Sequence, residues 1–276
     1  MIQKTLMSKA QLQKRQKFII VMIILLILLV VTFFISMNTG ASKLSPFEVF
    51  QTLLRQGTNR QNLVLFEFRL PRIVISVLVG IGLAISGCIL QSISRNALAE
   101  PGILGINSGA GLGVMLFISF VPAGALELSL FLPLFAFCGA LITAGIIYAF
   151  SYKRGEGISP TRLILTGIAI AAGINAAMIV LTLRLTPENY QSIAVWMAGN
   201  IGISSWKNVV ALLPWLIILL PIVLLKTRVL NVLDLGDQHA IGLGTSIERE
   251  RLFLLGSAVA LAGASVSVSG SISFVG

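Results

Sequence analysis

Residues 69–110 read RLPRIVISVLVGIGLAISGCILQSISRNALAEPGILGINSGA and are the most informative stretch of the chain. They set charged, amide and proline residues at the ends of two segments that are otherwise apolar enough for a bilayer core. A bilayer interior penalises ions and unpaired backbone groups, so polar residues gathered at span ends are typical of docking or pathway features. The pattern therefore indicates a membrane protein with a role in transport.

The composition of the chain excludes a soluble globular domain. Of the 276 residues, 56% are hydrophobic and only 11% are charged, and the mean hydropathy is +0.96. Such values are typical of a polytopic membrane protein. The net charge of +10 would suit either nucleic acid or a membrane surface. The basic residues lie in loops between apolar segments, which favours membrane lipid and predicts no nucleic-acid partner.

A window of about 20 residues, the length that crosses a hydrocarbon core of ~30 Å, finds seven candidate spans. They cover residues 18–37, 73–90, 102–121, 128–150, 161–183, 208–225 and 252–270. Between the first two, Ser45-Pro46-Phe47-Glu48 is typical of a helix start, and a short interfacial helix is predicted from Pro46 to Leu54. We therefore predict an all-α fold, a transmembrane helix bundle of about seven spans in one domain over residues 1–276.

The distribution of Lys and Arg over the loops predicts the orientation. Five of them lie in residues 1–17, before a first span that is too long for a signal-peptide core and has no A-x-A site after it. With the amino terminus in the cytoplasm, 13 Lys and Arg lie inside and seven outside. We predict that the basic tail 1–17 and the segment 226–251 are both cytoplasmic.

Small residues in the spans predict close helix packing. The seventh span is small almost throughout between Gly256 and Ser265, and lipid allows helices with small faces to bring their backbones together. The two cysteines, Cys88 and Cys138, lie inside apolar segments without ligand spacing. They are predicted to be packing residues rather than disulfide partners or metal ligands, and no metal site is predicted.

The residue types that the spans and loops lack limit how the protein could be energised. No Asp, Glu, Lys, Arg or His lies centrally in a candidate span, which disfavours ion coupling. The sequence has no G-x-x-x-x-G-K-[ST] motif, so any ATP has to be bound by a partner. His239 is the only histidine and lies in a loop, where a solvated surface role is favoured over catalysis. The sequence does not predict an enzyme.

Several segments together resemble the signature of the FecCD-type permeases. They include Arg69-Leu-Pro-Arg72, Arg95-Asn-Ala-Leu-Ala-Glu-Pro-Gly102, Gly105-Ile-Asn-Ser-Gly-Ala110, Ser159-Pro-Thr-Arg-Leu-Ile-Leu-Thr-Gly167, Trp196-Met-Ala-Gly199, Leu235-Gly-Asp-Gln-His-Ala-Ile-Gly-Leu-Gly244 and Ser271-Ile-Ser-Phe-Val-Gly276. This family provides the membrane subunits of type II ABC importers for iron-siderophores, haem and vitamin B12. Its members have about ten spans, so the resemblance implies that residues 1–276 are a permease domain that is incomplete at its C-terminal side.

The resemblance also implies a cargo and a set of partners. The cargo would be an iron-siderophore or a similar metal chelate, carried across the bacterial cytoplasmic membrane by a multi-pass protein. The partners would be a second permease subunit, identical or different, two cytoplasmic ATPase subunits and an extracytoplasmic solute-binding protein. ATP and Mg²⁺ would be bound by the ATPase subunits, and no cofactor by this chain.

The resemblance assigns two contact sites. Arg69 and Arg72 would dock acidic side chains of the binding protein, and the alternative is that they anchor a helix end at lipid head groups. Glycines interrupt the segment 226–251, which favours two short helices joined at an angle, with an ordinary solvated loop as the alternative. In the family this segment couples to the ATPase, and Leu233 and Ile241 would add apolar contact. The coupling residues would be Leu235, Gly236, Asp237, His239, Ala240, Gly242, Leu243 and Gly244.

Polar residues inside the spans mark a candidate translocation path. Asn107, Ser108 and Asn175 would face a central passage, although hydrogen bonds between helices explain the two asparagines equally well. Ser159, Pro160 and Thr161 match the region that forms the inner gate in the family. Two other functions stay open, namely an ion-coupled secondary transporter and a membrane fragment that packs against other subunits without transporting.

Overall fold

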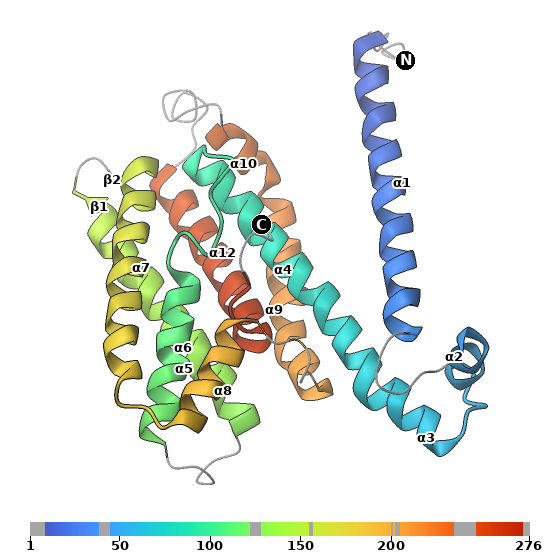
Figure 1. The fold of residues 1–276 in the computed structure, drawn as a ribbon. Coiled ribbons are helices and arrows are strands. Elements are labelled where there is room, and N and C mark those ends of the chain that lie inside the picture. The colour runs from blue at the N-terminus through green and yellow to red at the C-terminus, as the bar shows by residue number, and fades with distance from the viewer. Residues whose placement is uncertain are drawn as a thin grey trace. The chain divides into compact units, whose positions relative to one another are not determined.

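The computed structural model describes residues 9–38, 45–121, 128–154, 157–199, 201, 205–234 and 247–272. It divides into two compact units, Met1–Ile73 (unit 1) and Val74–Gly276 (unit 2). Helices make up almost all of the described structure (Figure 1). The predicted all-α transmembrane bundle is confirmed, whereas a single domain over residues 1–276 stays a prediction.

Unit 1 begins with α1 (Lys9–Asn38), a long apolar helix. Its side chains from Phe18 to Val31 are exposed, as expected of a helix that is solvated by lipid. The short helices α2 (Pro46–Leu53) and α3 (Asn59–Asn62) follow. The chain then passes through the π-helix η1 (Leu63–Arg69) directly into α4 (Leu70–Ser94). A small core of Met37, Val49 and Leu65 holds these elements together.

The start of α2 is fixed by reciprocal hydrogen bonds. The Ser45 hydroxyl accepts from the Glu48 amide at 3.2 Å, and the Ser45 amide donates to the Glu48 carboxylate at 2.7 Å. Pro46 occupies the first turn, where a missing amide proton costs nothing. The short helix predicted after Ser45 is therefore confirmed. The hydrogen bonds from the backbone and hydroxyl of Ser45, with a further one from Gln61, lower the pKa of Glu48 below its ordinary value.

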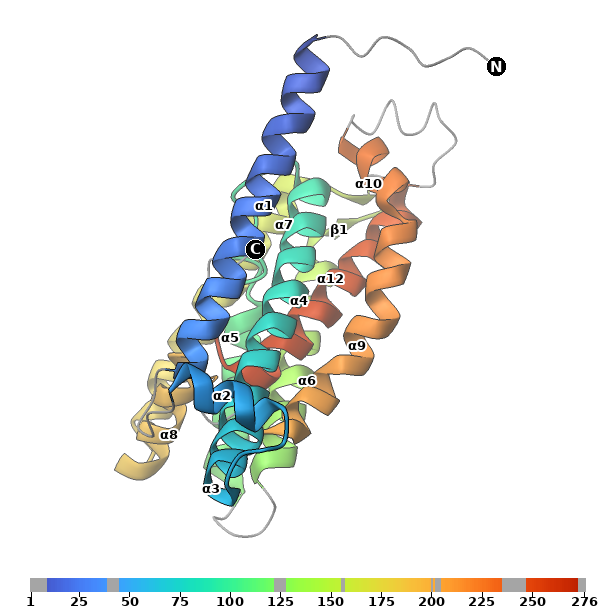
Figure 2. The ribbon, with the colours of Figure 1, turned by 90° about the vertical axis from the view of Figure 1, so that its right-hand side faces the viewer.

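Unit 2 holds the remaining helices. They are the rest of α4, α5 (Ile106–Phe120), α6 (Leu128–Ser151), α7 (Pro160–Thr182), α8 (Pro187–Met197), α9 (Trp206–Leu225), α10 (Thr227–Asp234) and α12 (Ile247–Ser269). Between α6 and α7, the two-residue strands β1 (Tyr152–Lys153) and β2 (Gly157–Ile158) pair antiparallel. Figure 2 shows α9 and α12 side by side, and the two helices are in contact.

Six helices in the described ranges are long and apolar enough to cross a membrane. They match six of the seven predicted spans. The seventh prediction, 102–121, is too long: α5 is a helix of 15 residues that starts only at Ile106, because residues 101–105 form turns. The helix α8 was not predicted as an element, since its polar side chains give no span signal.

Helix α12 forms the centre of unit 2. Of its most apolar window, 78% is buried, and it contacts α5, α6 and α9. The serine hydroxyls of α12 donate to backbone carbonyl oxygens of the same helix. Ser265 donates to the Leu261 carbonyl at 2.7 Å and Ser269 to the Ser265 carbonyl at 2.9 Å. The hydroxyl of Ser86 on α4 donates to the Ala258 carbonyl at 2.8 Å. The predicted close packing of the seventh span is seen directly.

Cys88 and Cys138, in contrast, are free and exposed, so their prediction as packed residues is wrong.

Helices α5 and α6 pack backbone against backbone. A Cβ atom added to Gly139 would collide with the carbonyl oxygen of Gly109, and one added to Gly113 would collide with the Phe135 carbonyl oxygen. Such contact is available only where neither helix carries a side chain. The close approach places α5 firmly against α6, even though α5 is shorter than a membrane span.

We expect Gly139→Leu to disrupt this contact. Overpacking a tight core costs typically ~1–3 kcal/mol, and here the obstacle is backbone rather than a movable side chain. The variant should lose its folded form at a lower temperature than the wild type, measured by size-exclusion chromatography of heated, detergent-purified protein. Gly173→Leu on α7 is the matched control, because a Cβ there meets nothing within 4 Å. Equal melting of the two variants would contradict the packing described.

We expect the capping of α2 to depend on pH. The folded pKa of Glu48 lies below the ordinary value of 4.5, so its stabilising effect is complete above that value. It is lost as the pH falls through the lowered folded pKa. Carbon NMR of protein with labelled glutamate carboxyls should show one titration midpoint below 4.5 that disappears in Glu48→Gln. A Glu48 midpoint at or above the ordinary value would contradict the capping role.

Candidate translocation site

Two arginines fasten one end of unit 2, which we call the hairpin end because it carries β1 and β2. Arg251 on α12 is only 4% exposed and donates to the Ile158 carbonyl oxygen at 2.7 Å. Arg162 on α7 donates to the Ser151 carbonyl oxygen at 3.3 Å. The hairpin is therefore held from the central helix as well as from its own flanks.

The predicted gate residues lie directly after this fixed hairpin. Ser159 precedes α7, Pro160 opens the helix and Thr161 is exposed in its first turn. Because Arg251 holds Ile158, the start of α7 is linked to the start of α12. Their role as an inner gate stays a prediction.

Helix α10 is attached at the same end. Leu230 and Leu233 belong to the core, and Arg95 donates through Nε to the Leu233 carbonyl oxygen at 3.1 Å. Lys226, which precedes α10, contacts both carboxylate oxygens of Glu250 on α12 at 2.6 and 2.8 Å. These contacts fix both flanks of the segment that joins α10 to α12.

That segment carries the predicted coupling residues, which all lie outside the described residues: Leu235, Gly236, Asp237, His239, Ala240, Gly242, Leu243 and Gly244. Of the two short helices predicted within residues 226–251, one is present as α10. Leu233, however, is only 1% exposed, so the prediction that it contacts an ATPase is wrong. It packs inside unit 2 instead.

The turn between α4 and α5 is non-helical backbone among membrane-spanning helices. Arg95 and Gly105 have positive φ, at 51° and 74°. A Cβ added to Gly105 would lie 3.5 Å from the carbonyl oxygen of Gly167, which is within α7. The side chain of Glu100 is only 7% exposed. Irregular backbone is tolerated at membrane depth where protein covers it, and here α7 covers the turn.

The predicted path residues differ in their surroundings. Asn107, in the first turn of α5, is buried and donates through Nδ2 to the Ile272 carbonyl oxygen at 3.1 Å. Ser108 is half-buried, and Asn175 on α7 is exposed. Asn107 thus holds the segment after α12, which is the hydrogen-bonding alternative. Path lining by these three residues stays a prediction.

A large hollow lies at the opposite end of unit 2, with a volume of about 700 Å³. Its polar lining comes from α8 (Glu188, Gln191, Ser192), the start of α9 (Ser205, Asn208) and α12 (Ser267). This hollow was not predicted from the sequence. The Thr186-Pro-Glu-Asn-Tyr-Gln start of α8, with Thr186 accepting from the Asn189 amide at 3.4 Å, was the signal for an amphipathic helix outside the spans.

The two arginines predicted to dock a binding protein are not equivalent in unit 1. Arg69, the last residue of η1, is 9% exposed and its guanidinium donates to the Met37 carbonyl oxygen at the end of α1. Arg72 is exposed. The π-helical turn before Arg69 alters the spacing of side chains around the helix, which sequence reasoning did not foresee. Docking by Arg69 and Arg72 stays a prediction.

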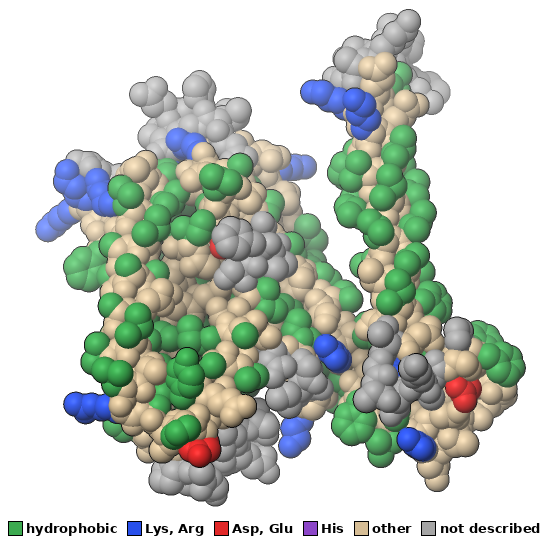
Figure 3. Space-filling model, in the orientation of Figure 1, with side chains coloured by type: hydrophobic (Ala, Val, Ile, Leu, Met, Phe, Trp, Pro, Cys, Tyr) green, Lys and Arg blue, Asp and Glu red, His purple; other side chains and the backbone are tan. Residues whose placement is uncertain are grey.

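Basic residues of unit 2 concentrate at the hairpin end. Eight of its ten Lys and Arg residues lie in the segments tied together there, and Figure 3 shows several of them on the face in view. They are Arg95, Lys153, Arg154, Arg162, Lys226, Arg228, Arg249 and Arg251. Arg184 and Lys207 flank α8, at the opposite end of unit 2. The orientation predicted from the distribution of Lys and Arg stays a prediction.

An all-helical unit of apolar spans, with a buried small-residue helix, a basic end and a polar hollow at the other end, defines a multi-pass membrane permease. Residues 18–276 match the FecCD transport family, and the chain belongs to this family. The predicted family is confirmed.

Among its relatives is the iron(3+)-hydroxamate import system permease protein FhuG of Bacillus subtilis, 49% identical over 248 residues that cover 88% of this chain and 73% of the relative. The iron-uptake system permease protein FeuC of the same organism is 38% identical over 88% of this chain and 74% of its own length. The hemin transport system permease protein HmuU of Yersinia pestis is 38% identical over 87% and 71%.

A solved structure shows the same fold. An inward-facing metal-chelate type ABC transporter superposes with a TM-score of 0.77 at 30% sequence identity, covering 91% of this chain and 76% of that one. The type II ABC importer fold predicted from the sequence is therefore confirmed.

We expect Arg251→Met to loosen the hairpin end. Methionine keeps the length of the side chain but removes the donors to Ile158, and a lost hydrogen bond from a charged group costs ~1.5–3 kcal/mol. Trypsin should then cleave after Lys153 and Arg154 faster than in the wild type, measured by mass spectrometry of the peptides. Arg249→Met, an exposed residue of the same helix, is the control. If the two variants are cleaved equally slowly, Arg251 does not hold the hairpin.

Proposed function

We propose that this chain is the membrane subunit of an ATP-driven importer that carries a ferric siderophore or a similar iron chelate inward across the bacterial cytoplasmic membrane. The observation that carries the proposal is the 49% identity to an iron(3+)-hydroxamate import permease over 88% of the chain. The similarity to a metal-chelate type ABC transporter supports it independently. Among the chelates, a hydroxamate siderophore is the first to test.

In this proposal the hairpin end faces the cytoplasm, and so does the amino terminus. The basic residues gathered there support this orientation. The large hollow lined by α8, α9 and α12 then faces the extracytoplasmic side, where a binding protein delivers the chelate. Most polar groups of its lining are amides and hydroxyls, with Glu188 as the one carboxylate, and such weak contacts suit a large polar cargo that has to be released again.

ATP and Mg²⁺ belong to two cytoplasmic ATPase subunits in this proposal, and a second permease subunit completes the passage. The segment from Leu235 to Gly244 contacts the ATPase, and its flanks on α10 and α12 transmit the movement. Arg95, Lys226 and Glu250 support this role because they fix those flanks to the rest of unit 2. The permease itself performs no chemical step, and the iron crosses inside its chelator.

The proposal is tested by iron uptake. Proteoliposomes are made with the full transporter and its ATPase and are loaded with ATP inside. The binding protein is added outside. Radioactive iron bound to a hydroxamate siderophore should enter only when ATP and the binding protein are both present. Uptake that needs an ion gradient instead of ATP would overturn the proposal in favour of a secondary transporter. No uptake of any iron chelate by the intact complex would also overturn it.

We expect the docking role to fall mainly on Arg72, because Arg69 is buried against the end of α1. Charge reversal in Arg72→Glu should weaken binding of the solute-binding protein by tenfold or more, as like charges across an interface cost several kcal/mol. Surface plasmon resonance with nanodisc-embedded transporter measures this affinity. Arg154→Glu, an exposed residue at the hairpin end, is the control for charge alone. Unchanged affinity in Arg72→Glu would remove this residue from the docking site.

A further inference from the structure

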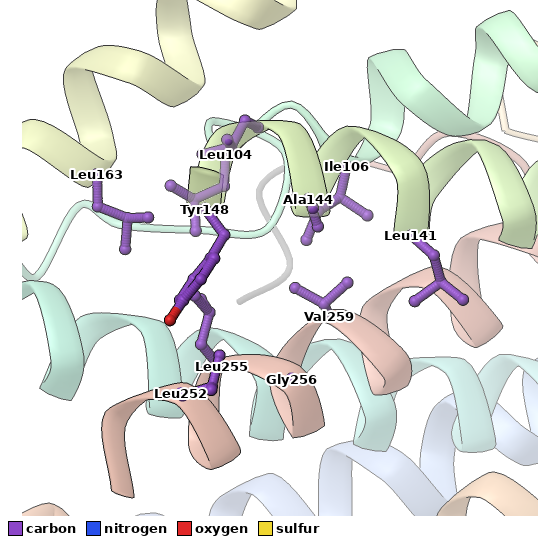
Figure 4. A pocket seen from close by; sticks show the side chains of 12 residues that line it. Leu104, Ile106, Leu141, Ala144, Tyr148, Leu163, Leu252, Leu255, Gly256 and Val259 are labelled. Carbon is purple, nitrogen blue, oxygen red and sulfur yellow. The ribbon is translucent and has the colours of Figure 1, made fainter. Parts of the chain in front are cut away.

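An apolar crevice lies between α6 and α12 in unit 2 and has a volume of about 260 Å³. Figure 4 shows Leu141, Ala144 and Tyr148 of α6 on one side and Leu252, Gly256 and Val259 of α12 on the other. None of its lining residues carries a charge, and the hydroxyl of Tyr148 is the one polar side-chain group in the lining. A space of this kind takes hydrocarbon and excludes a polar ligand.

Two glycines create the crevice. Gly145 on α6 and Gly256 on α12 both line it, and a Cβ added at either position would meet nothing within 4 Å. Both glycines are exposed, and Leu141 and Leu252 at the lining are 40% and 46% exposed. Because α6 and α12 are both membrane spans, the crevice opens at a surface that faces other apolar material.

A basic group stands at one end of the crevice. Arg249 lies three residues before Leu252 on α12, which is one helical turn, and it is exposed. It lines a second, more polar hollow together with Lys226, Glu250, Leu252 and Phe253. Leu252 lines both hollows, so the polar hollow that contains Arg249 lies next to the apolar crevice. Lys226 is already paired with Glu250, which leaves Arg249 as the exposed cation of this hollow.

We propose that the crevice binds one acyl chain of a membrane phospholipid, whose phosphate lies at Arg249. The apolar slot, the Tyr148 hydroxyl and the neighbouring Arg249 together match the polarity of such a lipid from its tail to its head group. Arg249 is at the hairpin end, where the positive charge of the loops and the head groups of the cytoplasmic leaflet coincide.

The size of the crevice favours a single chain. The crevice is a narrow slot of about 260 Å³ lined mainly by aliphatic side chains and two glycines, a shape that suits an extended chain. A single acyl chain is narrow enough to lie between the two glycines. Because bulk lipid is as apolar as the slot, retention of the chain rests on van der Waals contact in the slot and on the charge of Arg249.

Native mass spectrometry of the detergent-purified transporter tests the proposal. After delipidation, dioleoyl phosphatidylglycerol is titrated in, and the wild type should retain one lipid per chain at collision energies that strip the others. Gly145→Leu and Gly256→Leu add side chains to the slot at positions where a Cβ meets no neighbour, and each should lose this lipid. Gly173→Leu, whose Cβ is equally unobstructed on α7, should keep it. Melting curves of the three variants show that each is folded.

Arg249→Gln tests the head-group contact. Each basic residue near a membrane surface contributes about fivefold in affinity for an acidic lipid, so the variant should bind the retained lipid about fivefold more weakly. If Gly145→Leu and Gly256→Leu both retain the lipid, the proposal is overturned. Loss of the lipid from the control Gly173→Leu would overturn it too. A wild type that retains no lipid would also overturn the proposal. Unchanged affinity in Arg249→Gln would overturn the placement of the phosphate.

Discussion

The packing of α12 is the constraint on which unit 2 depends. A helix in the centre of a bundle has to be approached from several sides, and in lipid there is no hydrophobic force to hold loosely packed neighbours. The alanines, glycines and serines of α12 allow α4, α6 and α9 to come close, and Ser265 shows how a buried hydroxyl stays satisfied within its own helix. Larger side chains at these positions would separate the neighbours, and the contact of Ser86 with Ala258 would be lost.

The same requirement explains how the turn after α4 is tolerated. Backbone groups without helical partners are costly in a membrane, so the turn has to be covered by protein. Gly105 lies against Gly167 of α7, and α5 is held by the backbone contact of Gly109 with Gly139. The short helix α5 is therefore stabilised by its neighbours and not by spanning the membrane itself. Asn107 then ties the first turn of α5 to the segment after α12.

Hydropathy predicted the membrane helices well because burial in lipid and burial in protein both select apolar residues. It failed where local geometry decides. Residues 102–105 are apolar enough for a span, but Pro101 and two glycines turn the chain, so α5 starts later. Helix α8 carries too many polar groups to register as a span. The burial of Arg69 depends on a π-helical turn and on Met37 in another helix, and no spacing in the sequence reveals either.

At the hairpin end, both flanks of the segment 235–246 are connected to α7. A partner that acts on residues 235–246 acts, within the proposed function, on two helices whose attachments differ. On one flank, Arg95 joins α10 to the turn before α5, and this turn lies against α7. On the other flank, Lys226 holds Glu250 while the next residue, Arg251, holds the hairpin that begins α7. Both flanks therefore lead to α7, which carries the predicted gate residues Ser159 to Thr161. A displacement of the segment reaches the gate by two routes, and breaking one of them leaves the other in place.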